Sequence, residues 1–232
     1  MAAFKEPHSA SEGNTSIQTL LDPNCGIPPD VLFEIVDSDG KKCGEALGGH
    51  KNLLALKSDV FKAMFFGPLK EEGVIKLHET SDAAFMNLIR YTLNSEDIWT
   101  NSNLKTVFET AELAERFQMQ GLQDQAVSFM EGVEVCQETW FHAASLAEQF
   151  HLLPPVSEAL LNNCASFLKK TFKTPDDFNE FSDTYSKKED GLIAFRLLAR
   201  IDMNDIVTSS WRAVRLRLRQ PPSSPLPPRS PR

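Results

Sequence analysis

Three short apolar segments in the first third of the chain predict β-strands. The segment from Val31 to Val36 is rich in β-branched and aromatic residues and is too short for a buried helix. Asp37-Ser38-Asp39-Gly40 follows, and Asp-Gly tolerates the positive φ of a tight hairpin, so a second strand is expected within Cys43–Leu47. The aspartates also fit the start of a calcium loop, but Gly40 comes too early and no Glu closes it. A third strand is expected at Val74–Leu77.

From His50 onwards the apolar positions mostly repeat at helical spacing. Phe61, Met64 and Phe65 fall at i, i+3 and i+4, with Ser58 or Asp59 placed to cap the helix. Gly67-Pro68 should end this helix. Further amphipathic helices are expected over residues 82–92, 104–117 and 122–130.

The second half of the chain repeats a helical pattern. Ala111–Phe117 returns as Ala144–Phe150, 33 residues later, and each copy is followed by a second helix, at 122–130 and at 156–171. A third helical pair is expected at 175–185 and 192–201. A strand hairpin, helices, one more strand and then only helices indicate an α+β protein rather than a βαβ repeat.

The charge is unevenly distributed along the chain. The net charge is −8, but residues 207–232 hold six arginines and no acids, so residues 1–206 carry −14. An acidic body repels a phosphate backbone, which disfavours nucleic-acid binding by the folded part. Residues 1–26 are expected to be a flexible leader, and the Arg/Pro-rich segment 207–232 a disordered tail.

The remaining motifs argue against secretion, membrane insertion and catalysis. We find no signal peptide and no apolar stretch near the ~20 residues that span a bilayer. The four cysteines are far apart, which is typical of reduced thiols in a cytoplasmic or nuclear protein. No catalytic motif or metal-ligand spacing occurs. We therefore expect an intracellular protein with no enzymatic activity and no cofactor or metal.

The order of these elements and several short motifs resemble the BTB (POZ) family over residues 27–130. The matching motifs are Pro29-Asp30-Val31, His50-Lys51-Asn52-Leu53-Leu54-Ala55, Ser58-Asp59-Val60-Phe61-Lys62-Ala63-Met64-Phe65, Ile75-Lys76-Leu77, and Phe85 with Leu88-Ile89-Arg90-Tyr91. The chain departs from the family at Tyr91-Thr92-Leu93-Asn94, where Tyr-Thr-Gly is frequent. The resemblance implies a BTB/POZ fold, a small sheet flanked by helices. Residues 131–206 resemble the all-helical BACK extension that follows many such domains, with an unrelated helical tail as the alternative.

The resemblance also implies which residues contact partners. Leu69-Lys70-Glu71 matches the hydrophobic-x-acid triplet that recruits cullin-3, and Phe65 is assigned to the same surface. Alternatively, Leu69 only packs the loop and Glu71 is a solvated acid. Asp30 and Lys51 match a buried charge pair near the BTB dimer interface; as an alternative, they are a strand-start residue and a solvated helix residue.

The function implied by the resemblance is that of a homodimeric adaptor that brings a target protein to a cullin-3 ubiquitin ligase. The helical hairpin within Thr139–Leu168 would then extend the cullin-binding groove, with Trp140, Phe141 and Phe150 mostly in its core. No target-binding domain is visible, so the target is unknown. The alternative is a self-associating scaffold or a transcription-regulator fragment that does not bind cullin.

Overall fold

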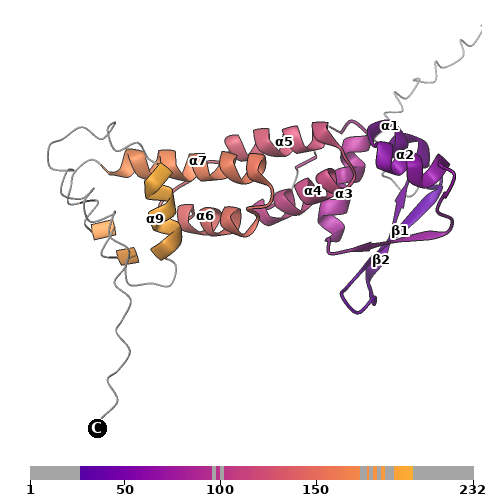
Figure 1. The fold of residues 1–232 in the computed structure, drawn as a ribbon, viewed down its shortest axis with the longest axis horizontal. Coiled ribbons are helices and arrows are strands. Elements are labelled where there is room, and N and C mark those ends of the chain that lie inside the picture. The colour runs from indigo at the N-terminus through magenta and orange to yellow at the C-terminus, as the bar shows by residue number, and fades with distance from the viewer. Residues whose placement is uncertain are drawn as a thin grey trace, which may run out of the picture. The chain divides into compact units, whose positions relative to one another are not determined.

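The computed structural model (Figure 1) describes residues 27–95, 98–99, 102–172, 177, 180–181, 184–185 and 191–200. The chain divides between Gln123 and Asp124 into two compact units. Each unit is described by itself below, with helix and strand labels as in Figure 1. The predicted leader (1–26) and tail (207–232) lie outside the described residues.

The first unit contains a mixed three-stranded sheet in the order β2-β1-β3. Strand β1 (Val31–Val36) pairs antiparallel with β2 (Lys42–Gly49) and parallel with β3 (Val74–His78). The turn between β1 and β2 is the predicted hairpin: Gly40 has a φ of +76°, and Asp37 Oδ1 accepts the amide of Lys41 over 2.8 Å. Strand β2 is longer than the predicted Cys43–Leu47.

The described part of the first unit also contains helices before and after β3. They are α1 (Lys51–Lys57), α2 (Asp59–Phe66), α3 (Asp82–Thr92) and α4 (Leu104–Arg116), followed by α5 (Gln120–Glu131), which crosses the boundary. Ser58 caps α2 by accepting the amide of Phe61 over 3.1 Å, and Ser81 caps α3 in the same way. The Gly67 turn ends α2, as its sequence predicted.

Aromatic side chains dominate the core between the sheet and these helices. Phe33 of β1 lies 4.6 Å from Phe85 of α3, measured between ring centroids, and Phe61 of α2 stacks on Phe117 at 4.1 Å. All four side chains are buried. Figure 1 shows α1 and α2 beside the strands, and their apolar residues complete this core.

The described part of the second unit consists of helices and connecting loops, without a strand. It comprises the end of α5, then α6 (Trp140–Gln149), α7 (Pro154–Thr171) and α9 (Gly191–Arg200), and α6 packs along α7 as the predicted hairpin. Trp140 is fully buried, whereas Phe141 and Phe150 are half-buried. Most of the predicted helix 175–185 lies outside the described residues. The sheet of the first unit and these helices confirm the α+β fold class.

Candidate protein-interaction surface

The loop between α2 and β3 carries the most exposed large apolar side chain that the structure describes. Leu69 is 91% exposed, and Phe66, the last residue of α2, is 57% exposed. Large apolar side chains with this much exposure gain free energy by burial against another molecule. The loop is therefore the first candidate for a contact surface.

Two backbone hydrogen bonds hold this loop against the end of α2. The amide of Gly67 donates to the carbonyl of Ala63 over 2.9 Å, and the amide of Glu71 donates to the carbonyl of Met64 over 2.8 Å. A Cβ atom at Gly67 would lie 2.3 Å from the Ala63 oxygen, so no other residue fits without a backbone shift. The second of these bonds closes residues 64–71 into a small ring that carries Leu69.

The charges of the loop leave one carboxylate available. Lys70 Nζ lies 2.9 Å from Glu72 Oε1, so these two exposed residues form an ion pair. Glu71 is exposed and has no ion-pair partner among the described residues. The apolar side chain of Leu69 and the unpaired acid of Glu71 thus belong to the same closed loop.

Phe65, which the sequence assigned to this surface, lies inside the core instead. Its side chain is 4% exposed and stacks on the ring of Phe61 at 5.6 Å between centroids. The Lys51 ammonium lies 5.8 Å from the Phe65 centroid. In this structure Phe65 is a core residue, and Phe66, one residue later, is the aromatic side chain that reaches solvent.

Asp30 and Lys51 meet in the structure, but their side chains do not form an ion pair. Asp30 Oδ1 accepts the backbone amide of Lys51, the first residue of α1, over 2.7 Å. His50, the N-cap residue of α1, makes no side-chain cap of its own, so Asp30 supplies the missing acceptor. Asp30 is exposed and Lys51 half-buried, so the expected buried charge pair is not present within a single chain.

The family of the first unit follows from a comparison with known proteins. Residues 25–133 match the family model of the BTB/POZ domain. This part of the chain is a BTB/POZ domain. The chain is 33% identical over 110 residues to "BTB/POZ domain-containing protein 3" of Homo sapiens and of Mus musculus. That alignment covers 47% of this chain but only 20% and 19% of the two relatives, so the chain spans about one fifth of their length.

The BTB/POZ assignment establishes a protein-interaction module. It confirms the resemblance derived from the ordered motifs between Asp30 and Tyr91. The candidate loop lies inside this domain, which gives its exposed leucine a functional context. Whether the helices after the domain are a BACK-type extension stays a prediction.

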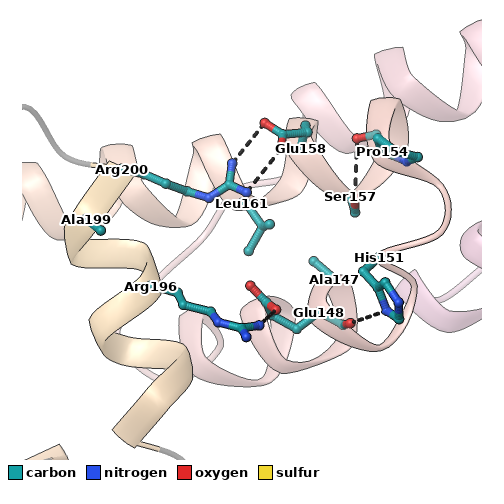
Figure 2. Close-up of a pocket in the computed structure, with 10 residues that line it drawn as sticks. All are labelled: Ala147, Glu148, His151, Pro154, Ser157, Glu158, Leu161, Arg196, Ala199 and Arg200. Atoms are coloured by element: carbon teal, nitrogen blue, oxygen red, sulfur yellow. Dashed lines mark hydrogen bonds and ion pairs between the residues drawn. The ribbon is translucent and has the colours of Figure 1, made fainter. Parts of the chain in front are cut away.

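The second unit contains a separate cavity of about 480 Å³, lined by α6, α7 and α9 (Figure 2). Arg196 of α9 forms an ion pair with Glu148 of α6 at 2.5 Å. Arg200 of α9 donates two hydrogen bonds, of 2.8 and 3.1 Å, to Glu158 of α7. Both arginines therefore already have carboxylate partners. The charges of these four residues cancel, so they do not attract an ionic ligand. The two ion pairs instead connect α9 to the α6–α7 hairpin.

The structure offers no alternative chemistry in the residues that it describes. Within these ranges no three His, Cys, Asp or Glu side chains gather as metal ligands, and no helix is long and apolar enough to cross a membrane. Cys164 is buried, and this burial raises the pKa of its thiol to about 12. A thiol in that environment stays protonated and inert at neutral pH.

Phe66 is the surface residue that the sequence reasoning missed. The helical spacing of Phe61, Met64 and Phe65 identified the buried face of α2 correctly, and Phe66 falls about 100° away from Phe65 on the same helix. A phenylalanine outside the apolar stripe, immediately before a Gly-Pro stop, was the available signal.

Proposed function

We propose that this chain is a homodimeric adaptor that recruits cullin-3 through its BTB/POZ domain and so brings a target protein to a ubiquitin ligase. The observation that carries this proposal is Leu69, which is 91% exposed on a loop closed by the Glu71–Met64 hydrogen bond. A BTB/POZ domain is a protein-interaction module, and this loop exposes the apolar side chain of Leu69 and the acid of Glu71.

The physical basis of recruitment is the burial of one leucine next to one carboxylate. Complete burial of a leucine side chain contributes roughly 1.5–3 kcal/mol, and anchors of this kind dominate many interfaces. Glu71 would add direction, because an acid favours a basic or hydrogen-bonding group on the partner. Since the loop is already closed, little conformational entropy is lost when a partner binds.

The rest of the adaptor proposal concerns the second unit and the compartment. We propose that the helices after the domain are a BACK-type extension and that the α6–α7 hairpin also contacts cullin-3. In this role the chain has no active site of its own, since ubiquitin transfer is performed by other subunits. The role requires that the chain act in the cytoplasm or the nucleus. The target protein is unknown.

A self-associating scaffold without cullin is the second candidate function. Leu32 of β1 and Val74 of β3 are paired neighbours in the sheet, and both are exposed large apolar residues. Two such side chains side by side favour contact with another protein surface, such as a second copy of the domain. This candidate keeps the dimer and assigns no partner to Leu69.

Binding of purified cullin-3 to the full chain separates the two candidates. The wild-type chain should capture cullin-3, and the double variant Leu69→Ala/Glu71→Ala should lose most of that capture. Leu192→Ala is the matched control, because Leu192 is an exposed leucine of α9 outside the BTB/POZ domain. A wild-type chain that captures no cullin-3 would exclude the adaptor role. Unchanged capture by the double variant would exclude a role of Leu69 and Glu71 in cullin-3 binding.

Self-association is tested on the same samples by size-exclusion chromatography with light scattering. The adaptor and the scaffold both require a dimer, with a mass twice the 26.0 kDa of the chain. A monomer at micromolar concentration would contradict both. The double variant should remain dimeric, since the proposed cullin surface is not the proposed dimer surface.

A further inference from the structure

Phe66 is the second large apolar side chain that the closed loop exposes. Its side chain is 57% exposed, whereas that of Phe65 is 4% exposed. The rings of Phe66 and Phe65 pack edge to face, with 6.3 Å between their centroids. An exposed phenylalanine three residues before an exposed leucine is the kind of side chain that often anchors an interface.

Phe66 and Leu69 belong to the same hydrogen-bonded loop. Both residues lie inside the ring that the Glu71–Met64 hydrogen bond closes. The chain turns directly after Phe66, because Gly67 ends α2 and donates its amide to the carbonyl of Ala63. The closed ring therefore limits the distance between the Phe66 and Leu69 side chains.

We propose that Phe66 is a second anchor for cullin-3, and that it sets specificity by requiring an apolar pocket wide enough for an aromatic ring. This inference rests on the proposed cullin-3 recruitment and adds a residue outside the Leu69-x-Glu71 triplet. The partner surface that fits has an apolar groove for Phe66 and Leu69 and a basic group near Glu71. The Lys70–Glu72 ion pair leaves Glu71 as the acid of the loop that is open to such a group.

The test is the dissociation constant of purified cullin-3 for the full chain, measured by isothermal titration calorimetry. Phe66→Ala should weaken binding by about tenfold or more, which is the loss expected when an interface anchor is truncated. Phe66→Leu should give an intermediate loss, because it keeps apolar area and removes the ring. Leu56→Ala is the matched control, since Leu56 is a strongly exposed apolar residue of α1 outside the ring, and it should bind like wild type.

A double-mutant cycle with Leu69→Ala tests whether the two anchors act together. If Phe66 and Leu69 enter one groove, the two losses should not add, because each variant disturbs the contact of the other. Thermal unfolding checks the fold of each variant; if Phe66→Ala lowers the melting temperature, the comparison of wild type with Phe66→Leu is used.

Three outcomes would overturn the inference, and they differ from one another. Unchanged binding by Phe66→Ala and Phe66→Leu, with loss in Leu69→Ala, removes Phe66 and leaves the adaptor role in place. No binding by wild type removes the adaptor role and the second anchor with it. Conversion of the dimer to a monomer by Phe66→Ala, seen by light scattering, assigns Phe66 to the interface between copies instead.

Discussion

The buried hydroxyl of Ser58 donates a hydrogen bond to the backbone carbonyl of Phe117 over 2.5 Å. The same oxygen accepts the amide of Phe61 and so caps α2. One side chain therefore links the start of α2 to the end of α4, where the rings of Phe61 and Phe117 also stack. This link lies in the core of the BTB/POZ domain and positions the helix that carries the candidate loop.

Replacement of Ser58 by alanine should destabilise the domain. The variant loses a helix cap and leaves the buried carbonyl of Phe117 without this donor, so we expect the free energy of unfolding to fall by about 1–3 kcal/mol. Urea unfolding followed by circular dichroism measures the change. Ser128→Ala, at an exposed serine of α5, is the control and should be nearly neutral. A Ser58→Ala loss no larger than that of the control would contradict the double role of the hydroxyl.

The amide of Glu71 should exchange slowly with deuterium even though the residue is exposed. Its hydrogen bond to the Met64 carbonyl protects it as long as the ring is closed. Gly67→Ala should open the ring, because the new Cβ would lie 2.3 Å from the Ala63 oxygen. In that variant we expect fast exchange at Glu71 and weaker capture of cullin-3.

Gly132→Ala is the control for this loop experiment. The atoms nearest to a Cβ at Gly132 are 3.5 and 3.7 Å away, which is ordinary contact, and the residue lies outside the loop. Fast exchange of the Glu71 amide in the wild-type chain would contradict the closed ring. If Gly67→Ala opens the ring without weakening cullin-3 capture, the preorganisation of Leu69 has no role in binding.

Features set by neighbouring residues could be predicted from the sequence, and features set by distant ones could not. The Asp-Gly hairpin and the Ser58 cap depend on a few consecutive residues, and both have the expected geometry. The burial of Phe65 depends on Phe61, whose ring stacks in turn on the distant Phe117, so the neighbouring residues alone did not reveal it. Motif order sufficed for the BTB/POZ fold because many local matches occur in the correct sequence.

The Asp30–Lys51 contact illustrates the same limit. These residues were matched as a charge pair, but Asp30 bonds the backbone amide of Lys51 rather than its ammonium. The reason is the start of α1, where His50 gives no side-chain cap and Asp30, 21 positions before Lys51, supplies an acceptor instead. Only the three-dimensional arrangement of β1 and α1 reveals which atom of Lys51 is used.

The cysteines should differ strongly in reactivity. Burial raises the pKa of Cys164 to about 12, so its thiolate is scarce at pH 8, whereas Cys136 is exposed. Brief treatment of the native chain with iodoacetamide, read by peptide mass spectrometry, should label Cys136 and spare Cys164. In urea the two should react at similar rates. Native labelling of Cys164 as fast as that of Cys136 would contradict the packing of α7.

The ion pair between Arg200 and Glu158 should make the stability of the second unit sensitive to acid. The hydrogen bond from Arg200 lowers the pKa of Glu158 below the ordinary value of a glutamate side chain. The pair therefore stabilises the folded unit above that value, and this contribution is lost as the pH falls through the lowered pKa. Both side chains are partly exposed, so the contribution is small.

Thermal unfolding of Glu158→Gln at several pH values measures this contribution. The variant should melt slightly lower than wild type at pH 7, by no more than about 4 °C, and the difference should vanish in strong acid. Glu131→Gln, an exposed acid of α5, controls for the loss of one negative charge. A difference between Glu158→Gln and wild type that persists at the lowest pH would show that the effect does not come from the ion pair.

Three variants distinguish capping by Asp30 from a charge pair with Lys51. Asp30→Ala removes the acceptor at the start of α1 and should lower the free energy of unfolding by about 1 kcal/mol. Asp30→Asn keeps an oxygen acceptor and should retain most of the stability, while Lys51→Met keeps the backbone amide that Asp30 bonds. Urea unfolding should therefore rank wild type and Asp30→Asn together, above Asp30→Ala.

If Asp30 and Lys51 instead form a charge pair at the dimer interface, the strength of self-association should rank the variants differently from their stability. A charge pair across or beside the interface would make Asp30→Asn and Lys51→Met weaken self-association equally, because each removes one charge and neither removes the cap. Sedimentation at several concentrations gives the dissociation constant of the dimer. Equal loss of self-association in these two variants, with stability retained in Asp30→Asn, would mean that Asp30 caps α1 within the chain and serves the dimer through its charge. Wild-type self-association in both variants would leave the cap as the whole role of Asp30.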